Sequence, residues 1–291
     1  MPLSSRKLFI LGVLALAPSA RADLALMARP PVYVDAKNLA LKAPEGLGCS
    51  ATTLVVADTG NARLVSYGWK DGVVDGGTEI KLPQLAMPVR VQVDPKGFIF
   101  VLDRKAKKIA RLSPTGAFQS WVETKDVVPG AFRVDAAGAL YVFDVASNAV
   151  LAFDPSGVVT RRIPAPKDAL VTDVALDTSG NVLALDARGA AVWTAEKGAT
   201  AFRQLSKNLS DAMNFPGYLG LDEKGTLLIV DQNGNGLVLL SPDGAYLGRR
   251  LAIGWSDGLV YYPGQLCVAA GGELALADRG NNRVQLFTLT R

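Results

Sequence analysis

The chain has 291 residues, 49% of them hydrophobic, and none of them is histidine. The lack of histidine excludes Ser-His-Asp and Cys-His catalysis and histidine-ligated zinc or iron, which leaves proton transfer to carboxylates, Lys, Tyr or Arg. The chain has 31 Lys and Arg residues, and three of them, Arg6, Lys7 and Arg21, lie in the first 22 residues, which have the pattern of a cleaved leader. Without that leader, 28 basic residues remain against 27 Asp and Glu. A nearly neutral mature chain argues against nucleic acid as a partner, because that affinity depends on neutralising phosphates.

The first 22 residues have the pattern of a secretory signal peptide. A basic start is followed by the apolar run from Leu8 to Ala17, and Pro18 ends that run before Ala20-Arg21-Ala22, a small-x-small cleavage pattern. The alternative is an uncleaved anchor, but the run is short for a helix that spans a bilayer. The sequence therefore predicts cleavage after Ala22, a mature chain 23–291 with no membrane span, and export to the periplasm or the extracellular space.

An apolar strand that ends in aspartate returns six times along the mature chain. The six aspartates follow one another at intervals of 45, 41, 42, 45 and 47 residues. They are Asp58, Asp103, Asp144, Asp186, Asp231 and Asp278. Repeats of this length, built from short strands and tight turns, are typical of a β-propeller with one blade per repeat.

Turn signals within each repeat divide it into four antiparallel strands. In four repeats an Asp-x-x-Gly turn begins nine residues before the strand-ending aspartate, at Asp94, Asp135, Asp177 and Asp222. Aspartate first and glycine fourth suit a type I turn. The sequence predicts an all-β, six-bladed propeller in a single domain, 23–291, with blades that start near residues 44, 87, 128, 169, 215 and 262.

The two chain ends predict how the ring closes. The last repeat stops at residues 288–291, directly after its third strand, and residues 23–43 precede the first repeat without a blade of their own. We expect the N-terminal segment to supply the missing outer strand of the last blade, because an open sheet edge would otherwise remain.

The two cysteines lie in the inner strands of the first and last blades, which the closure makes neighbours. Cys49 is five residues after Pro44, and Cys267 is four residues after Pro263. Their side chains should project from opposite faces of their blades, and therefore either face each other or both point away. Export favours a ring-closing disulfide over two free, buried thiols.

Residues after two of the strand-ending aspartates resemble the NHL repeat. Asp58, Asn61 and Arg63 in the first repeat, and Asp278, Asn281 and Arg283 in the last, fit the family pattern of Val-x-Asp, a turn with Asn, then Arg and an apolar strand. The other four repeats have Lys108, Ala149, Ala191 and Gly236 in place of the arginine. We interpret these Asp and Arg residues as structural, each pair contributing about 1 kcal/mol or less if exposed.

The resemblance implies a binding platform more often than a catalyst. Amidating lyases and virginiamycin-type lyases rely on histidine, so their activity is not expected here. Gluconolactonase-like propellers hold a divalent ion through Glu, Asn and Asp, and the lack of histidine does not exclude them. Their motifs do not match this sequence position by position.

Polar residues of the predicted inner strands are the candidate ligand contacts of the channel. They are Arg90, Arg133, Asp173, Tyr218 and Gln265. One interpretation is an internal network of ion pairs and hydrogen bonds that fills the channel, because buried charges need partners. The other is capture of a small anionic group or a peptide end by the two arginines.

Two further segments could suggest a binding site, but a structural interpretation is favoured for each. Residues 231–236 resemble part of a calcium loop, yet the downstream glutamate is missing, so a glycine-rich hairpin turn is favoured. The basic run from Arg104 to Arg111 is favoured as a solvated hairpin over a phosphate site.

The sequence favours an exported, monomeric, non-enzymatic propeller that presents a loop face to a protein or cell-envelope partner. It predicts no catalytic residue and no cofactor. The alternative to the absence of a cofactor is a divalent ion bound in the channel. A metal-dependent, lactonase-like hydrolase and a small-ligand sensor that uses the central channel remain as alternative functions.

Overall fold

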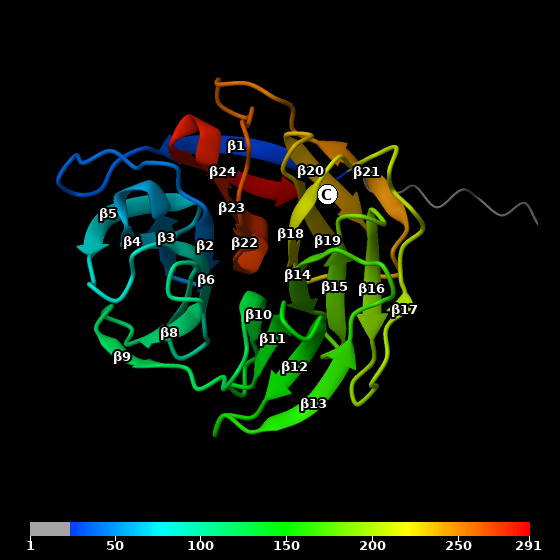
Figure 1. Ribbon diagram of the computed structural model, residues 1–291. Helices are drawn as coiled ribbons and strands as arrows, with labels where there is room; N and C mark the ends of the chain where they lie inside the picture. The colour runs from blue at the N-terminus through cyan, green and yellow to red at the C-terminus, as the bar shows by residue number, and fades with distance from the viewer. Residues whose placement is uncertain (1–23) are drawn as a thin grey trace, which may run out of the picture.

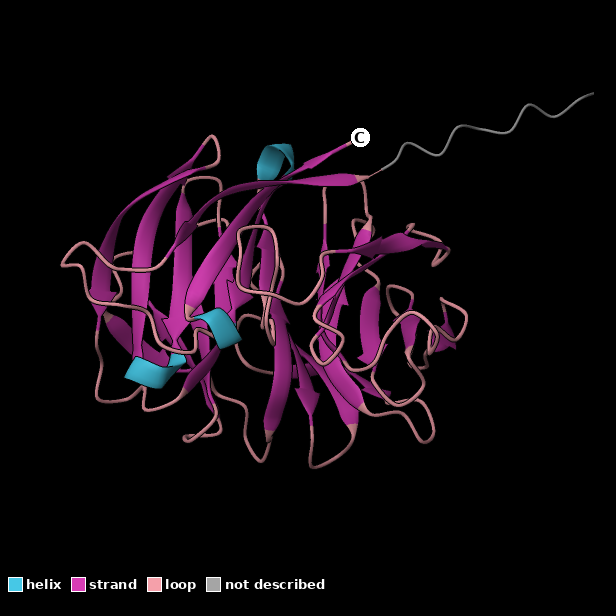
Figure 2. Ribbon diagram, turned by 90° about the horizontal axis from the view of Figure 1, so that it is seen from above, coloured by secondary structure: helices cyan, strands magenta, loops and turns pink. Residues whose placement is uncertain are grey.

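The computed structural model describes residues 24–291, so the predicted signal peptide lies outside the described residues. The described chain forms six four-stranded antiparallel sheets, and Figure 1 shows them arranged around a common axis as the blades of a ring. The prediction of a six-bladed β-propeller is confirmed. Within residues 24–291 the helical segments are three single 3₁₀ turns, Thr59–Asn61, Ala270–Gly272 and Arg279–Asn281, which stand out against the strands in Figure 2. No described helix has the length and apolar character to cross a membrane.

Each of the first five blades is made of four strands that are consecutive in sequence. Blades 1 and 2 comprise β2 (Gly46–Cys49), β3 (Thr53–Asp58), β4 (Arg63–Lys70) and β5 (Val73–Ile80), then β6 (Pro88–Val93), β7 (Ile99–Asp103), β8 (Lys108–Leu112) and β9 (Phe118–Trp121). Blades 3 and 4 comprise β10 (Pro129–Val134), β11 (Leu140–Asp144), β12 (Ala149–Phe153) and β13 (Val159–Pro164), then β14 (Val171–Leu176), β15 (Val182–Asp186), β16 (Ala191–Ala195) and β17 (Arg203–Gln204). Blade 5 comprises β18 (Pro216–Leu221), β19 (Leu227–Asp231), β20 (Gly236–Leu240) and β21 (Tyr246–Arg250).

Blade 6 is completed by the N-terminal part of the chain. Its sheet order is β1-β24-β23-β22, with β22 (Leu266–Val268), β23 (Glu273–Asp278), β24 (Arg283–Thr290) and β1 (Ala25–Val32). β1 pairs antiparallel with β24, from Ala25 opposite Thr290 to Val32 opposite Val284, and the two strands lie side by side in Figure 1. The predicted closure by the N-terminal segment is confirmed, and β1 covers the edge that β24 would otherwise leave open.

The Asp-x-x-Gly segments form the predicted turns between the first and second strands of four blades. In the first of them, Oδ1 of Asp94 accepts hydrogen bonds from the N–H groups of Lys96, at 2.9 Å, and Phe98, at 2.8 Å. The fourth residue, Gly97, has a φ of +83°, a conformation that glycine adopts without the steric cost of a Cβ. Local chemistry therefore sets these turns.

The strand-ending aspartates fasten each blade to the loop that enters it. In blades 1 to 5 a carboxylate oxygen accepts the N–H of the residue sixteen positions earlier, which lies just before the inner strand: Lys42, Met87, Val128, Leu170 and Phe215. In blade 6, Asp278 binds the N–H of Tyr261 in the same way at 2.7 Å. All six aspartates are buried, so the repeated residue has a structural role.

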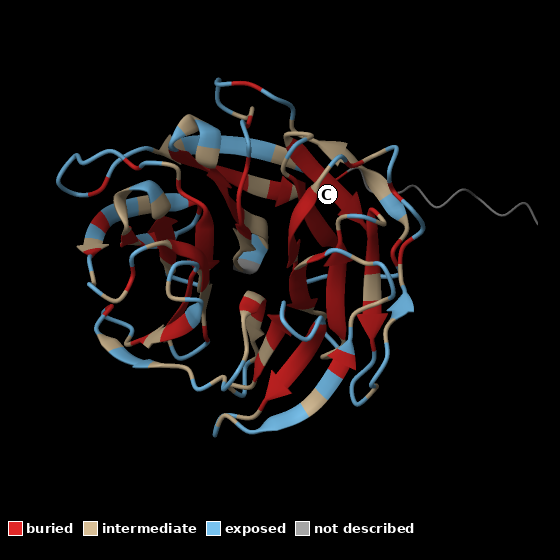
Figure 3. Cartoon of the chain, viewed as in Figure 1, coloured by how far each residue is buried: buried red, intermediate tan, exposed pale blue. Residues whose placement is uncertain are grey.

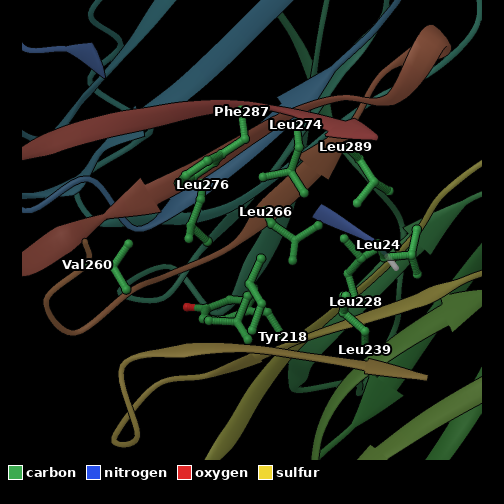
Figure 4. Packing of buried hydrophobic residues seen from close by; sticks show 12 residues of the cluster. Leu24, Tyr218, Leu228, Leu239, Val260, Leu266, Leu274, Leu276, Phe287 and Leu289 are labelled. Carbon is green, nitrogen blue, oxygen red and sulfur yellow. The ribbon is translucent and has the colours of Figure 1, made fainter. Parts of the chain in front are cut away.

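The hydrophobic core consists of one cluster at each of the six interfaces between neighbouring blades. Figure 3 shows the buried residues concentrated on the strands and the exposed ones on loops and outer strands. Figure 4 shows the interface of blades 5 and 6, where Tyr218, Leu228 and Leu239 face Leu266 and Leu276. Because no blade buries both of its faces alone, stability depends on the ring being complete.

Candidate functional site

The inner strands bring side chains to the axis of the ring in two levels. The first level consists of the inner-strand residues that pair with the residue just before each strand-ending aspartate. These residues are Gly46, Arg90, Ala131, Asp173, Tyr218 and Gln265. The second level follows two residues later and contains Gln92 and Arg133. We call the face on which the inner strands begin the entry face, and the face on which they end the exit face.

Asp173 is the centre of the first level and has no unused oxygen. Its Oδ1 accepts the Arg90 guanidinium and the N–H of Val174, each at 2.9 Å. Its Oδ2 accepts the N–H of Leu219 at 2.8 Å and lies 3.7 Å from Arg133. Asp173 is buried, and this set of donors gives a buried carboxylate the partners that it requires.

The two candidate arginines bind protein groups on several blades. Arg90 also donates to the carbonyl of Thr172 at 2.6 Å, while Arg133 donates to the carbonyls of Val174, at 2.9 Å, and Leu219. Burial lowers the pKa of Arg133, and the charge of Arg90 adds to this effect, whereas Asp173 opposes it. The arginines therefore join blades 2, 3, 4 and 5 across the axis.

Gln265 links blade 6 to blades 1 and 2. Its Oε1 accepts the N–H groups of Leu47, at 3.1 Å, and Val91, at 3.0 Å, and its Nε2 donates to the carbonyl of Val91 at 3.2 Å. Both atoms of the buried amide are thus used within the protein. The five predicted contacts lie on these two levels around the axis, and we call them together the central network.

Tyr218 connects this network to a carboxylate that the sequence interpretation did not include. The Arg90 guanidinium lies 4.5 Å from the centre of the Tyr218 ring, a cation–π arrangement. The Tyr218 hydroxyl donates to Oε1 of Glu45 at 3.2 Å. Burial raises the pKa of Tyr218, and the charge of Glu45 raises it further, so the hydroxyl keeps its proton and remains a donor.

Glu45 lies at the entry mouth between two arginines. Arg104 binds its Oε1, and Arg279 lies 3.8 Å from its Oε2. Glu45 is buried, and its Oε2 accepts no hydrogen bond. Glu45, Arg104 and Arg279 form the entry-mouth cluster.

A sequence signal for this cluster existed but was not used. Arg104 and Arg279 each follow a strand-ending aspartate directly, as do Thr59, Val145, Ala187 and Gln232 in the other blades. Because all six aspartates end equivalent strands, the residues after them form a ring at the entry mouth. Reading that position across the repeats would have selected the two arginines.

The exit face has a cavity at the axis, beside the disulfide. Its volume is about 230 Å³, and its lining includes Gln92, Arg133, Cys49 and Cys267. The two cysteines form a disulfide with their Cα atoms 6.0 Å apart, and the bond closes a loop of 218 residues. This bond joins the inner strands of blades 1 and 6.

The residues of the NHL-like motif do not contact the central network. Arg63 donates to Asp58 at 2.7 Å and to Asp35 at 2.6 Å, and Arg283 donates to Asp278 at 2.7 Å. All five side chains are buried, so these pairs are shielded from water and the estimate for an exposed pair does not apply to them. Burial lowers the pKa of Arg63, but its hydrogen bonds to both carboxylates outweigh burial and raise the pKa overall.

The donor set does not fit a divalent metal ion at either candidate position. Oδ1 of Asp231 accepts the N–H groups of Asn214 and Phe215, and its Oδ2 pairs with Arg249 at 2.7 Å. At the entry mouth, Glu45 is bound by Arg104 and by the Tyr218 hydroxyl, and its other charged neighbour is Arg279. Among residues 24–291, no three His, Cys, Asp or Glu side chains gather in a way that could hold a metal.

Comparison with known proteins places the chain by its fold alone. No protein-family model matches it, and no curated protein sequence does either. Its structure is similar to that of a streptogramin B lyase, with a TM-score of 0.65, 12% identity, and coverage of 92% of this chain and 98% of that one. A gluconolactonase from Xanthomonas campestris gives a TM-score of 0.65 at 16% identity, with 93% and 99% covered. A protein of unknown function from Bacteroides thetaiotaomicron gives 0.68 at 13%, with 92% and 76% covered.

These similarities support the six-bladed propeller, and several of the similar structures are enzymes. At such low identity they show the fold and not the activity. By its architecture, the chain is a six-bladed β-propeller, similar in fold to the lyase and gluconolactonase structures.

Proposed function

We propose that the protein is an exported, non-enzymatic NHL-type propeller that binds a protein of the cell envelope through the entry face at blades 5 and 6. The proposal rests on one observation: this face exposes a group of aromatic side chains immediately beside the entry mouth. The central network also supports a non-enzymatic role, because its polar groups already bind other groups of the protein.

The aromatic group lies on the loop that connects β21 to β22. Trp255 is 73% exposed, and Tyr261 and Tyr262 are each 41% exposed. The rings of Trp255 and Tyr261 lie 6.1 Å apart, and the Arg279 guanidinium lies 5.5 Å from the Tyr262 ring. Trp, Tyr and Arg are the residue types that most often dominate the binding energy of protein interfaces. Trp255, Tyr261 and Tyr262 define the aromatic patch.

The experiment that tests this proposal is affinity capture of the tagged mature chain after crosslinking in cells, followed by mass spectrometry. We expect a stoichiometric envelope protein crosslinked near the aromatic patch. Trp255→Ala should weaken its binding by about 30-fold or more, as truncation of an interface hot spot does. Tyr246→Ala is the matched control, because Tyr246 is also an exposed aromatic residue, 43% exposed, but lies on the outer strand of blade 5. Equal capture by the Trp255→Ala chain, or no partner at all, would reject the proposal.

A lactonase-like hydrolase is the second candidate. The similarity to gluconolactonase folds and the unbonded Oε2 of Glu45 at the entry mouth favour it. Against it, Glu45 pairs with Arg104, and Asp173 is fully occupied. Hydrolysis of aldonolactones by the mature protein, with and without added Ca²⁺, decides between the candidates. Turnover that disappears in Glu45→Gln would establish the hydrolase, and we expect none.

A further inference from the structure

A small basic cavity on the entry face lies apart from the aromatic patch. It is located between blades 2 and 3, has a volume of about 250 Å³, and is lined by Arg90, Arg104 and Lys107. Its remaining walls are mainly apolar and include Val89, Val128 and Pro129, and no acidic residue lines it. Three cations line this cavity without a carboxylate among them, so its electrostatic potential favours an anion.

The charges behind the cavity do not neutralise it. Asp173 is shared by Arg90 and Arg133, and Glu45 is shared by Arg104 and Arg279. Beside the cavity, Asp103 and Asp144 bind backbone N–H groups. These four carboxylates together carry one charge fewer than the four guanidinium groups and the ammonium of Lys107.

The two arginines are held in place while the lysine is exposed. Asp173 and the Thr172 carbonyl fix the guanidinium of Arg90, and Glu45 anchors that of Arg104, although the Arg104 side chain is itself 52% exposed. Each guanidinium has five N–H donors, so neither has exhausted its capacity to bind. Lys107 is exposed and has a φ of +54°, on the turn between β7 and β8.

We propose that this cavity binds a small organic anion, with its carboxylate or phosphate at Arg104 and Lys107 and a compact apolar body against Val89, Val128 and Pro129. The volume lies below the usual range for drug-sized ligands, which limits the body to about one ring or a short alkyl chain. This site goes beyond the proposed protein-binding role and does not depend on it.

Benzoate and phenyl phosphate are the probes that test the proposal, and benzamide is the uncharged control of the same shape. Amide shifts of the ¹⁵N-labelled mature protein are followed during titration with each compound. We expect benzoate or phenyl phosphate to shift the amides of Lys107, Val128 and Gly130 with a dissociation constant of about 1 mM, and benzamide to bind at least tenfold more weakly. A preference between the two anions identifies the carboxylate or the phosphate as the natural group.

The location is tested by two lysine variants on the same turn. Lys107→Gln should weaken binding of the anion about three- to tenfold, since one partly screened charge is lost. Lys105→Gln removes the same charge from an exposed residue that does not line the cavity, and it should leave binding unchanged. Benzamide binding as tightly as benzoate, no shifts with either anion, or equal affinities in the two variants would overturn the proposal. The benzamide comparison uses the unaltered chain, so it decides even if Lys107→Gln does not fold.

Discussion

Blades 1 and 6 satisfy their buried aspartates differently from blades 2 to 5. In blades 1 and 6, an arginine and an asparagine of the same blade bind the second carboxylate oxygen, as Arg63 and Asn61 do for Asp58, at 2.7 and 2.8 Å. In blades 2 to 5, backbone N–H groups of the following turn contribute, as those of Ala106 and Ser147 do, and in blade 5 an arginine of the outer strand, Arg249, also binds Asp231. Every blade has the buried aspartate, but its hydrogen-bond donors differ between blades. A buried carboxylate needs hydrogen-bond donors, and both side chains and backbone N–H groups can supply them.

The arginines of the motif occur in the two blades where the ring closes. Arg63 also binds Asp35, and Arg283 binds the hydroxyl of Tyr33 at 2.8 Å and Asp257 at 3.2 Å. Asp35 and Tyr33 belong to the segment that leads from the closing strand to blade 1. The full motif thus holds the closing segment in place, and the disulfide joins the same two blades at their inner strands.

The largest expected effect comes from breaking the closure at the disulfide. Cys49→Ala combined with Cys267→Ala removes a cross-link that spans 218 residues, and the free energy of unfolding should fall by about 5 kcal/mol, because the unfolded chain regains the entropy of that loop. Urea unfolding of the variant and of the parent protein measures the difference. A change below about 1 kcal/mol would mean that strand pairing alone secures the ring.

The second prediction compares the arginine position between blades 6 and 2. Arg283→Ala should lower the free energy of unfolding by about 3–5 kcal/mol, because Asp278 stays buried without its charged partner. The equivalent residue of blade 2 is Lys108, which lies opposite Asp103 and has an exposed side chain. Lys108→Ala should therefore change the free energy of unfolding by about 0.5 kcal/mol or less. Thermal or urea unfolding of both variants tests the contrast. Similar losses at the two positions would show that the arginines have no special role at the closure.

The smallest expected effect is a difference in pH dependence between blades 3 and 6. Burial acts to raise the pKa of Asp144, but hydrogen bonds from Ser147 and from the N–H groups of Val128 and Ala146 outweigh it and hold the pKa below its ordinary value. In Asp278 burial prevails over the donors and raises the pKa. Stabilisation by Asp144 is therefore present above about pH 4 and lost as the pH falls through its lowered pKa, whereas Asp278 has the opposite dependence.

Two variants and two pH values measure this difference. Asp144→Asn should cost about 1–2 kcal/mol at pH 6, and its deficit relative to the parent protein should shrink at pH 3. The deficit of Asp278→Asn should not shrink, because protonation of Asp278 favours the folded parent protein. Parallel acid dependences in the two variants would contradict the assignment.

The fold followed from local patterns that physical chemistry constrains strongly. Asp58 and its five counterparts, the Asp94 type of turn and the missing outer strand of the last repeat were sufficient to predict the blades and their closure. Each of these signals acts over a few residues or repeats regularly, so the sequence carries it without knowledge of distant contacts. The inner-strand alignment also placed Arg90, Asp173, Tyr218 and Gln265 at one level around the axis.

The tertiary structure alone decided what those side chains bind. Glu45 joins Tyr218 across 173 residues and Arg90 joins Asp173 across 83, and no local pattern encodes which neighbour a long side chain reaches. The burial of Arg63 with Asp35, and the meeting of Arg90, Arg104 and Lys107 around one cavity, likewise depend on how the ring brings separate blades together. The sequence by itself determined the repeat and its closure because these follow from backbone geometry and periodicity. Partners, burial and cavities were decided by the closed ring, because they are properties of long-range packing.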